Sequence, residues 1–254
     1  MTIIKVKDSR YEEYESLLLR RDSLKRDAEQ YAISYTQVFG DLIIKVFKKK
    51  IECIAKKKKI AYCQKLQNKS LPINEDELER YLEQVMWMYE EELNDLIKEN
   101  KAVKEAKLTG PLELRKIKEI YYKLAKLIHP DMRPDLSNDK NIQEFWRRIV
   151  IAYNFNQLDE LEELNFQVNN YLNNINNEDI TIEIPNIEEK INKVKEDITK
   201  ILSTNPYQYK FILEDDEEIE AYKKELEDEY KNYDEYSKEL DEVLINFEIV
   251  RNYA

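Results

Sequence analysis

Apolar residues recur along the N-terminal third at alternating steps of three and four, the spacing of a helix that packs against another helix. The repeat comprises Tyr14, Leu17, Leu24, Ala28, Tyr31, Tyr35 and Val38, and continues through Ile44, Phe47, Ile51 and Ile54. Arg21 interrupts this apolar seam. The pattern predicts one long helix that ends near residues 68–72, with Gly40 as a kink or a tolerated interior glycine.

A second helical pattern begins after residue 72. Asn74 followed by Glu77 has the spacing of a capping box, in which two side chains satisfy free backbone N–H groups at the helix start. Apolar positions then follow at Leu78, Leu82, Val85, Tyr89, Leu93 and Leu96. Since the link between the two patterns is short, we expect an antiparallel helical hairpin over residues 1–108.

The C-terminal part repeats this design with a different composition. One seam comprises Ile187, Ile191, Val194, Ile198 and Ile201, and another comprises Ile219, Tyr222, Leu226, Glu229, Tyr233, Tyr236, Leu240, Val243, Phe247 and Val250. The break at residues 203–206 predicts a helical hairpin or coiled coil over 166–254. Asparagine-rich residues 158–179 predict a frayed segment or linker, and the alternation over 180–184 is typical of a short strand.

The middle of the chain combines an amphipathic helix with a rigid stop. Residues 114–128 place apolar side chains on one face and Lys116, Lys118, Lys123 and Lys126 on the remainder. The pattern ends at His129-Pro130-Asp131, where proline prevents continuation and predicts an exposed corner. A polar loop follows, and then a second amphipathic helix that carries Phe145, Trp146, Ile149, Ala152 and Tyr153.

Residues 110–165 resemble a J-domain. His129-Pro130-Asp131 matches the signature tripeptide of that family, Tyr121 with Leu124-Ala125 matches its second helix, and the residues from Trp146 to Tyr153 match its third. The tripeptide alone is a weak signal, but its position between two helices in register makes the resemblance specific.

Two departures from the family pattern lie beside this match. No sequence resembles the usual opening of the family's first helix, and we expect the helix over residues 93–108 to take its place. Tyr122-Lys123 stands where the family has paired basic residues, and we expect Lys118 and Lys126 to compensate. No glycine-phenylalanine-rich segment and no Cys-x-x-Cys repeat follows the module.

The resemblance implies a co-chaperone that stimulates ATP hydrolysis by a DnaK-type chaperone, rather than an enzyme. It implies a chaperone-binding surface and a packed core. The binding surface comprises His129, Pro130, Asp131, Lys118, Lys123, Lys126 and Arg133. The core of the module comprises Tyr121, Leu124, Ala125, Leu127, Trp146, Ile149, Ala152 and Tyr153. We expect the flanking arms to hold a protein client, whose identity the sequence does not name, near the chaperone.

Composition supports an all-α fold with elongated helical hairpins flanking the J-domain-like module of residues 109–165. The 254 residues include two glycines and six prolines, too few for a β-sandwich with many tight turns, and 37% are charged. No apolar run is long enough for a membrane span, and we expect no secretory signal, because the first residues lack its long apolar run. Cys53 and Cys63 lie nearly three helical turns apart, too far for an intrahelical disulfide, and suit a cytoplasmic protein with reduced thiols.

Other chemistry is poorly represented. His129 is the single histidine, so the sequence offers no catalytic triad and no metal site, and we expect no cofactor. Residues 45–69 hold ten lysines and one acid, Glu52. This basic run is either a solvated helix face, a partner for the acidic tail, or a nucleic-acid patch. We favour the first two, because no aromatic platform is interleaved and residues 166–254 hold 23 acidic against 10 basic side chains.

Two alternative functions therefore remain open besides the co-chaperone. One is a coiled-coil scaffold or adaptor whose J-like segment activates nothing. The other is a nucleic-acid-associated helical protein that uses the lysines of residues 45–69. Helical seams can close within one chain or between chains, so a homo-oligomer also remains open.

Overall fold

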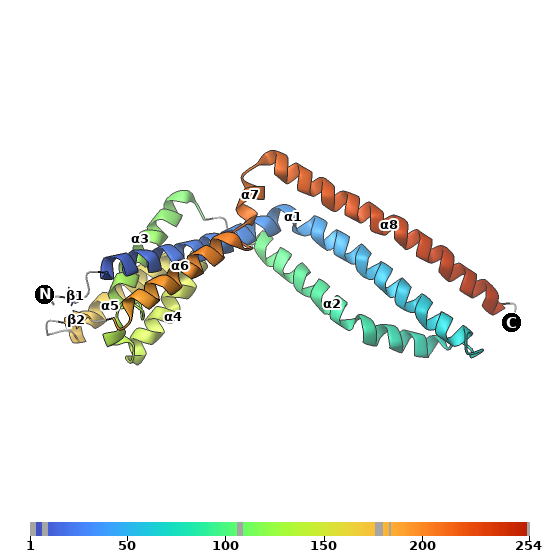
Figure 1. The fold of residues 1–254 in the computed structure, drawn as a ribbon, viewed down its shortest axis with the longest axis horizontal. Helices are drawn as coiled ribbons and strands as arrows, with labels where there is room; N and C mark the ends of the chain where they lie inside the picture. The colour runs from blue at the N-terminus through green and yellow to red at the C-terminus, as the bar shows by residue number, and fades with distance from the viewer. Residues whose placement is uncertain (1–3, 7–9, 106–108, 176–179, 183, 253–254) are drawn as a thin grey trace. The chain divides into compact units, whose positions relative to one another are not determined.

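A computed structural model describes residues 4–6, 10–105, 109–175, 180–182 and 184–252 of the chain. The helices of this part are α1 (Tyr11–Gln67), α2 (Glu75–Glu105), α3 (Pro111–Ile128), η1 (Pro134–Leu136), α4 (Lys140–Asn154), α5 (Leu158–Ile175), α6 (Ile187–Ser203), α7 (Tyr209–Leu213) and α8 (Asp216–Asn252). The strands are β1 (Ile4–Val6) and β2 (Ile180–Ile182). The helical content confirms the all-α class predicted from the sequence (Figure 1).

The chain forms two compact units. Unit 1 contains Met1–Ala32 and Lys107–Tyr209, and unit 2 contains Ile33–Ala106 and Lys210–Ala254. This division differs from the three consecutive segments 1–108, 109–165 and 166–254 expected from the sequence. Helix α1 contributes to both units, and α6 belongs to unit 1 whereas α8 belongs to unit 2. The two seams of the expected C-terminal hairpin therefore belong to different units.

Unit 1 is built around one continuous core. The first turns of α1 supply Tyr14 and Leu18, α3 supplies Leu124, and α4 and α6 supply Ile149 and Ile191. Each is almost fully excluded from solvent because the apolar face of every helix points inward. Figure 1 shows α3, α4, α5 and α6 packed together with the N-terminal end of α1.

Residues 158–175 form helix α5 and not the linker that their asparagines suggested. Leu161, Leu164, Val168 and Leu172 are buried along one face of α5, at steps of three and four. The burial of this face outweighs the modest helix-propensity cost of asparagine at exposed positions. The expected strand is present as β2, which pairs in parallel with β1 through the register Ile4 to Ile180. Glu183, within the predicted strand, lies outside the described residues.

In unit 2, helix α1 runs between α2 and α8 (Figure 1). Its contacts with α2 pair Tyr62 with Tyr81 and Asp41 with Lys104, so these two helices are antiparallel as predicted. In its contacts with α8, the residue numbers rise together along both helices, so α1 and α8 are parallel. These contacts join Tyr35 to Tyr222, Lys49 to Asp234 and Lys56 to Asp241.

The seam of α8 differs in detail from the predicted one. Ser237 is 2% exposed and lies between the buried residues Leu226 and Leu240, whereas the predicted seam residues Tyr236 and Val243 are exposed. The hydroxyl of Ser237 donates to the Glu52 carboxylate at 2.7 Å and accepts from Lys56 at 2.7 Å. A hydrophobicity pattern cannot find a buried serine whose hydrogen bonds come from another helix. Val250 lies where side chains are not described.

Gly40 has a packing role in unit 2. A Cβ at this position would lie 2.3 Å from Asn100 Oδ1, on the facing helix α2. Asn100 is buried, and its amide donates to Asp41 Oδ1 at 2.9 Å. The glycine therefore admits a polar side chain between α1 and α2, rather than introducing flexibility.

Candidate functional site: the corner between α3 and α4

Helices α3 and α4 form an antiparallel pair joined by residues 129–139. Tyr121 on α3 stacks on Tyr153 of α4 with ring centroids 3.8 Å apart, and His129 lies 4.6 Å from the ring of Trp146. From the first contact to the second, the residue number rises from 121 to 129 on the α3 side and falls from 153 to 146 on α4. The two helices therefore run in opposite directions. The predicted core residues Tyr121, Leu124, Ala125, Ile149, Ala152 and Tyr153 are buried, and Leu127 and Trp146 are partly buried against them.

The corner itself is only partly exposed. Asp139 caps α4, since its carboxylate accepts from the backbone N–H groups of Asn141 and Ile142 at 2.8 and 3.2 Å. At the other end His129 caps α3, and its own N–H donates to the carbonyl of Ala125 at 2.9 Å. Pro130 is exposed, as predicted for a stiff stop. His129 is 4% exposed, so the expectation that the whole tripeptide faces solvent is wrong.

Helix α1 covers His129. The imidazole Nε2 lies 3.5 Å from Asp22 Oδ2, and Nδ1 accepts the backbone N–H of Asp131 at 3.0 Å. These two contacts direct Nε2 at the Asp22 carboxylate and Nδ1 at the backbone of the corner. The ring is therefore fixed between α1, the corner and Trp146.

Asp22 is the centre of a buried polar network. Its Oδ1 accepts from Nε and Nη2 of Arg21 at 3.0 and 2.9 Å, and its Oδ2 accepts from the Tyr121 hydroxyl at 2.9 Å. Burial raises the pKa of Asp22, but the hydrogen bond from His129 and the charge of Arg21 outweigh burial and hold the pKa below its usual value. Burial and the nearby Asp22 carboxylate raise the pKa of Tyr121. The Asp22 carboxylate is therefore ionised, and both of its oxygens accept hydrogen bonds.

A cavity of about 330 Å³ opens beside this network. It is lined by Arg21, Asp22, Lys25, Tyr121, His129, Pro130, Asp131, Trp146, Val150, Tyr153 and Asn154. The Asp131 side chain is 47% exposed, and its Oδ2 lies 3.9 Å from Arg21 Nη1. Within residues 129–131, Pro130 and Asp131 are therefore the residues that another protein can reach directly.

The predicted basic surface of α3 is present in part. Lys123 and Lys126 are exposed, and Lys118 is half-buried with its ammonium 5.6 Å from the ring of Tyr122. Lys126 Nζ also lies 2.6 Å from Glu15 Oε1 on α1. The charge of Lys126 is thus partly neutralised within the chain.

Arg133 is buried, so its predicted place on the exposed chaperone-binding surface is wrong. The side chain is 1% exposed. Its guanidinium donates to the Leu127 carbonyl at 3.0 Å and to Asp135 at 2.7 Å. These bonds hold the last turn of α3 against the loop that leads to η1, so Arg133 fixes the shape of the corner.

Sequence reasoning missed the contribution of α1 to this site. The helix over residues 93–105, expected to stand in for the first J-domain helix, belongs to unit 2, and residues 106–108 lie outside the described part. The first turns of α1 pack against α3 instead, through Leu18 and Asp22. The sequence contained one sign of this contact: Arg21 interrupts the apolar seam of α1 and pairs with Asp22 in the site.

Other candidate chemistry is limited in the part of the chain that the structure describes. Those residues contain no cluster of three or more His, Cys, Asp or Glu side chains suited to a metal ion. None of the described helices combines the length and apolar character that crossing a bilayer requires. Cys53 and Cys63 are buried and are not joined in a disulfide.

The lysines of residues 45–69 are partly committed to ion pairs. Lys49 and Lys56 pair with Asp234 and Asp241 of α8 at 3.2 and 2.7 Å. Lys57 and Lys58 are exposed. Part of this basic run therefore faces the acidic tail, as one of the alternatives expected.

Comparisons with known proteins add no identification. No family model, no curated protein and no solved structure matches this chain.

Proposed function

We propose that the chain is a J-domain co-chaperone, a protein that stimulates ATP hydrolysis by a DnaK-type chaperone. The observation that carries the proposal is the antiparallel α3–α4 pair, closed by His129-Pro130-Asp131 and packed through the stacked rings of Tyr121 and Tyr153. The tripeptide alone recurs by chance, but its place at this corner, in register with both helices, is the arrangement that the resemblance requires.

The proposed contact uses the groups that solvent reaches. Lys123 and Lys126 on α3 would meet an acidic surface of the chaperone's ATPase domain, while Pro130 and Asp131 would contact the region that controls hydrolysis. Long-range attraction would guide docking, and added salt would weaken it. The co-chaperone would act by binding one conformation of its partner more tightly than the other, without transferring a proton.

A scaffold or adaptor is the second candidate function. The observation that favours it is the burial of His129 beneath α1, where Asp22 Oδ2 lies 3.5 Å from the imidazole. In such a protein the corner would be a structural cap on unit 1, and the long helices would supply the binding surfaces.

Steady-state ATP hydrolysis by a DnaK-type chaperone separates the two candidates. Wild-type protein should raise the rate, and Asp131→Asn should reduce that stimulation about tenfold, the loss of one charged contact across the interface. Asp159→Asn, an exposed aspartate on α5, is the matched control and should stimulate like wild type. Equal stimulation by wild type and Asp131→Asn would contradict the proposed contact.

Asp22→Asn tests whether the buried His129 takes part. The substitution keeps the volume of the side chain but removes the charge that holds the imidazole and Arg21. If α1 restrains a functional corner, Asp22→Asn should stimulate hydrolysis more strongly than wild type, and His129→Gln should not stimulate. If wild type, Asp22→Asn and His129→Gln all leave the rate at its basal value while circular dichroism is unchanged, the adaptor candidate is supported.

A further inference from the structure

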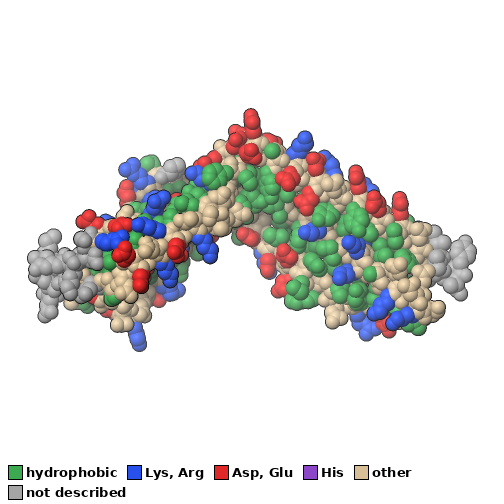
Figure 2. All heavy atoms as spheres, viewed as in Figure 1, with side chains coloured by type: hydrophobic (Ala, Val, Ile, Leu, Met, Phe, Trp, Pro, Cys, Tyr) green, Lys and Arg blue, Asp and Glu red, His purple; other side chains and the backbone are tan. Residues whose placement is uncertain are grey.

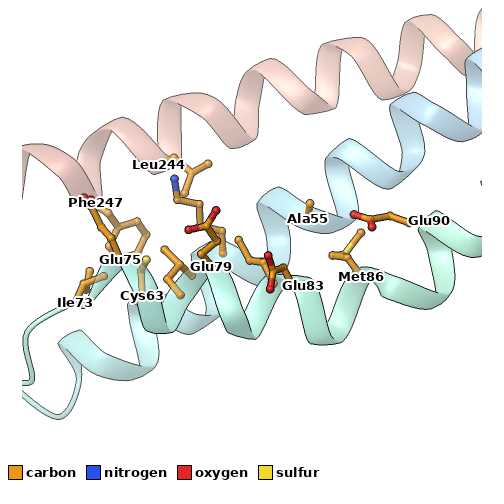
Figure 3. Close-up of a pocket in the computed structure, with 13 residues that line it drawn as sticks. Ala55, Cys63, Ile73, Glu75, Glu79, Glu83, Met86, Glu90, Leu244 and Phe247 are labelled. Atoms are coloured by element: carbon orange, nitrogen blue, oxygen red, sulfur yellow. The ribbon is translucent and has the colours of Figure 1, made fainter.

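An open apolar groove crosses unit 2 between α2 and α8, with a cavity of about 440 Å³. Its floor contains residues of three helices: Ala55 and Cys63 of α1, Leu78, Leu82 and Met86 of α2, and Leu244 and Phe247 of α8. Figure 3 shows Leu244 and Phe247 facing the α2 side chains across this gap. The groove is large enough to receive several apolar side chains of another molecule.

Acidic side chains border this groove. Glu79 and Glu83 lie one helical turn apart on α2, and Glu90 continues the border about two turns further on. Within the described part of the chain, none of these three carboxylates has a hydrogen-bond or ion-pair partner. Lys59 is the one cationic residue in the described lining, where Glu75 also lies. The border is therefore strongly negative around an apolar floor.

The arrangement of the helices explains why the groove is open. Helix α1 packs against α8 through Lys56 and against α2 through Tyr62, and α2 and α8 flank it as the two walls of the groove. Three helices in this arrangement leave the position that a fourth helix occupies in a bundle. Figure 2, in the view of Figure 1, also shows hydrophobic side chains on the surface of unit 2.

The groove has the length of a short helix. Its α2 border runs from Glu75 to Glu90, which is about 22 Å of helix at a rise of about 1.5 Å per residue. A partner helix of about four turns would cover it, with apolar side chains at positions i, i+3, i+4 and i+7 on the floor and cations beside the glutamates.

We propose that this groove binds a basic amphipathic helix of a partner protein. The apolar floor supplies the burial, and the unpaired Glu79, Glu83 and Glu90 select cations at the edge and reject anionic ligands such as nucleic acid. The proposal stands apart from the co-chaperone function, because every residue of the groove lies in unit 2 and none belongs to the corner between α3 and α4.

Fluorescence anisotropy with a labelled peptide tests the proposal. The peptide is an 18-residue helix of leucines and lysines, with leucine at i, i+3, i+4 and i+7, and a scrambled peptide of equal composition is the ligand control. Wild-type protein should bind the amphipathic peptide at least about tenfold more tightly than the scrambled one, a difference of about 1.4 kcal/mol.

Two triple variants of full-length protein separate the groove from general charge attraction. Glu79→Gln with Glu83→Gln and Glu90→Gln should weaken peptide binding about tenfold. The matched variant, Glu77→Gln with Glu91→Gln and Glu92→Gln, removes the same charge from exposed positions of the same helix outside the groove and should change binding less than about twofold. Equal weakening by both triple variants would overturn the proposal.

Leu244→Glu tests the apolar floor. This change adds a negative charge, so simple attraction to the lysines predicts tighter binding, whereas docking on the floor predicts binding at least about tenfold weaker. Unchanged helical circular dichroism of the variant is the folding control. Tighter binding by Leu244→Glu would overturn the proposal. So would sedimentation showing a wild-type dimer that Leu244→Glu converts to monomer, since a second copy would then occupy the groove.

Discussion

In unit 1 the helices α3, α4, α5 and α6 and the first turns of α1 surround one core, whereas in unit 2 three long helices lie with α1 in the middle. The contrast shows in the buried side chains. Unit 1 buries apolar residues from all of these helices in one cluster, but the core of unit 2 centres on Phe39, Val46 and Leu226 with half-buried tyrosines around them. Packing in a single layer leaves each helix with a narrow buried stripe and an open face.

Unit 2 supplements its narrow stripe with polar contacts between helices. Lys56 lies against Glu52 and Asp241 at 2.9 and 2.7 Å, and Lys49 bridges Glu52 and Asp234. Such pairs, close to the surface, contribute little individually but set which faces meet. Unit 1 therefore owes its stability mainly to burial, and the parallel register of α1 and α8 in unit 2 owes more to charge.

The largest expected difference between the units follows from removing one core leucine. Leu124 of α3 is 0% exposed in the core of unit 1, and Leu124→Ala should lower the free energy of unfolding of that unit by about 3 kcal/mol. Amide hydrogen exchange, which reports the two units separately, is the measurement.

Leu240→Ala in unit 2 is the matched variant. Leu240 is 7% exposed on α8, where neighbouring water can fill the space, so the loss of stability should be about 2 kcal/mol or less. A larger loss for Leu240→Ala than for Leu124→Ala would break the contrast between a closed core and an open layer.

A buried guanidinium should matter more than an exposed one. Arg133→Met should destabilise unit 1 by about 2 kcal/mol, because it leaves the Leu127 carbonyl and the Asp135 carboxylate without the donors that Arg133 supplies. Arg147→Met on α4 removes an exposed pair with Glu144 and should change stability by less than about 0.5 kcal/mol. Chemical denaturation of both variants, followed by circular dichroism, gives the comparison. Equal losses would show that burial of Arg133 is unimportant.

The smallest expected effect concerns the pH dependence of unit 2. Hydrogen bonds from Lys49, Lys56 and Ser237 lower the pKa of Glu52 from 4.5 to about 2. Because the pKa of Glu52 is lower in the folded than in the unfolded state, its ionised carboxylate stabilises the unit at pH values above about 4.5. This contribution is lost as the pH falls from about 4.5 to about 2. The side chain is 42% exposed, so solvent screening limits the contribution to about 1 kcal/mol.

Glu52→Gln checks this sign. The variant should lose about 1 kcal/mol near neutral pH and show a weaker dependence of stability on pH in the acid range. Hydrogen exchange of α1 and α8 at pH 6 and pH 3 is the measurement. A variant whose stability falls as steeply with acid as that of wild type would exclude Glu52 as the titrating group.

Local rules predicted many elements of the chain. The helix end near residues 68–72 and the Asn74 cap follow from local turn and capping rules, and Asn74 Oδ1 accepts the Glu77 N–H at 3.2 Å. Helix α5 was missed, since asparagine composition was given more weight than its buried leucines. The same limit applies to Ser237, whose burial depends on partners from another helix.

The candidate site divides along the same line. Pro130 follows from sequence as an exposed stop, because its ring fixes the local backbone wherever the chain goes. The burial of His129 and Arg133 does not follow, since it requires Asp22 from α1 and the loop of Asp135 to meet them.

The sequence by itself determined the helices, their caps and the stiff corner at Pro130, because those depend on neighbours within a few residues. Tertiary structure alone decided that α1 serves both units, that α8 runs parallel to α1, and that Asp22 covers His129. An amphipathic helix records that one face is buried but not which partner buries it. That choice depends on the combined packing and charge of segments far apart in the chain.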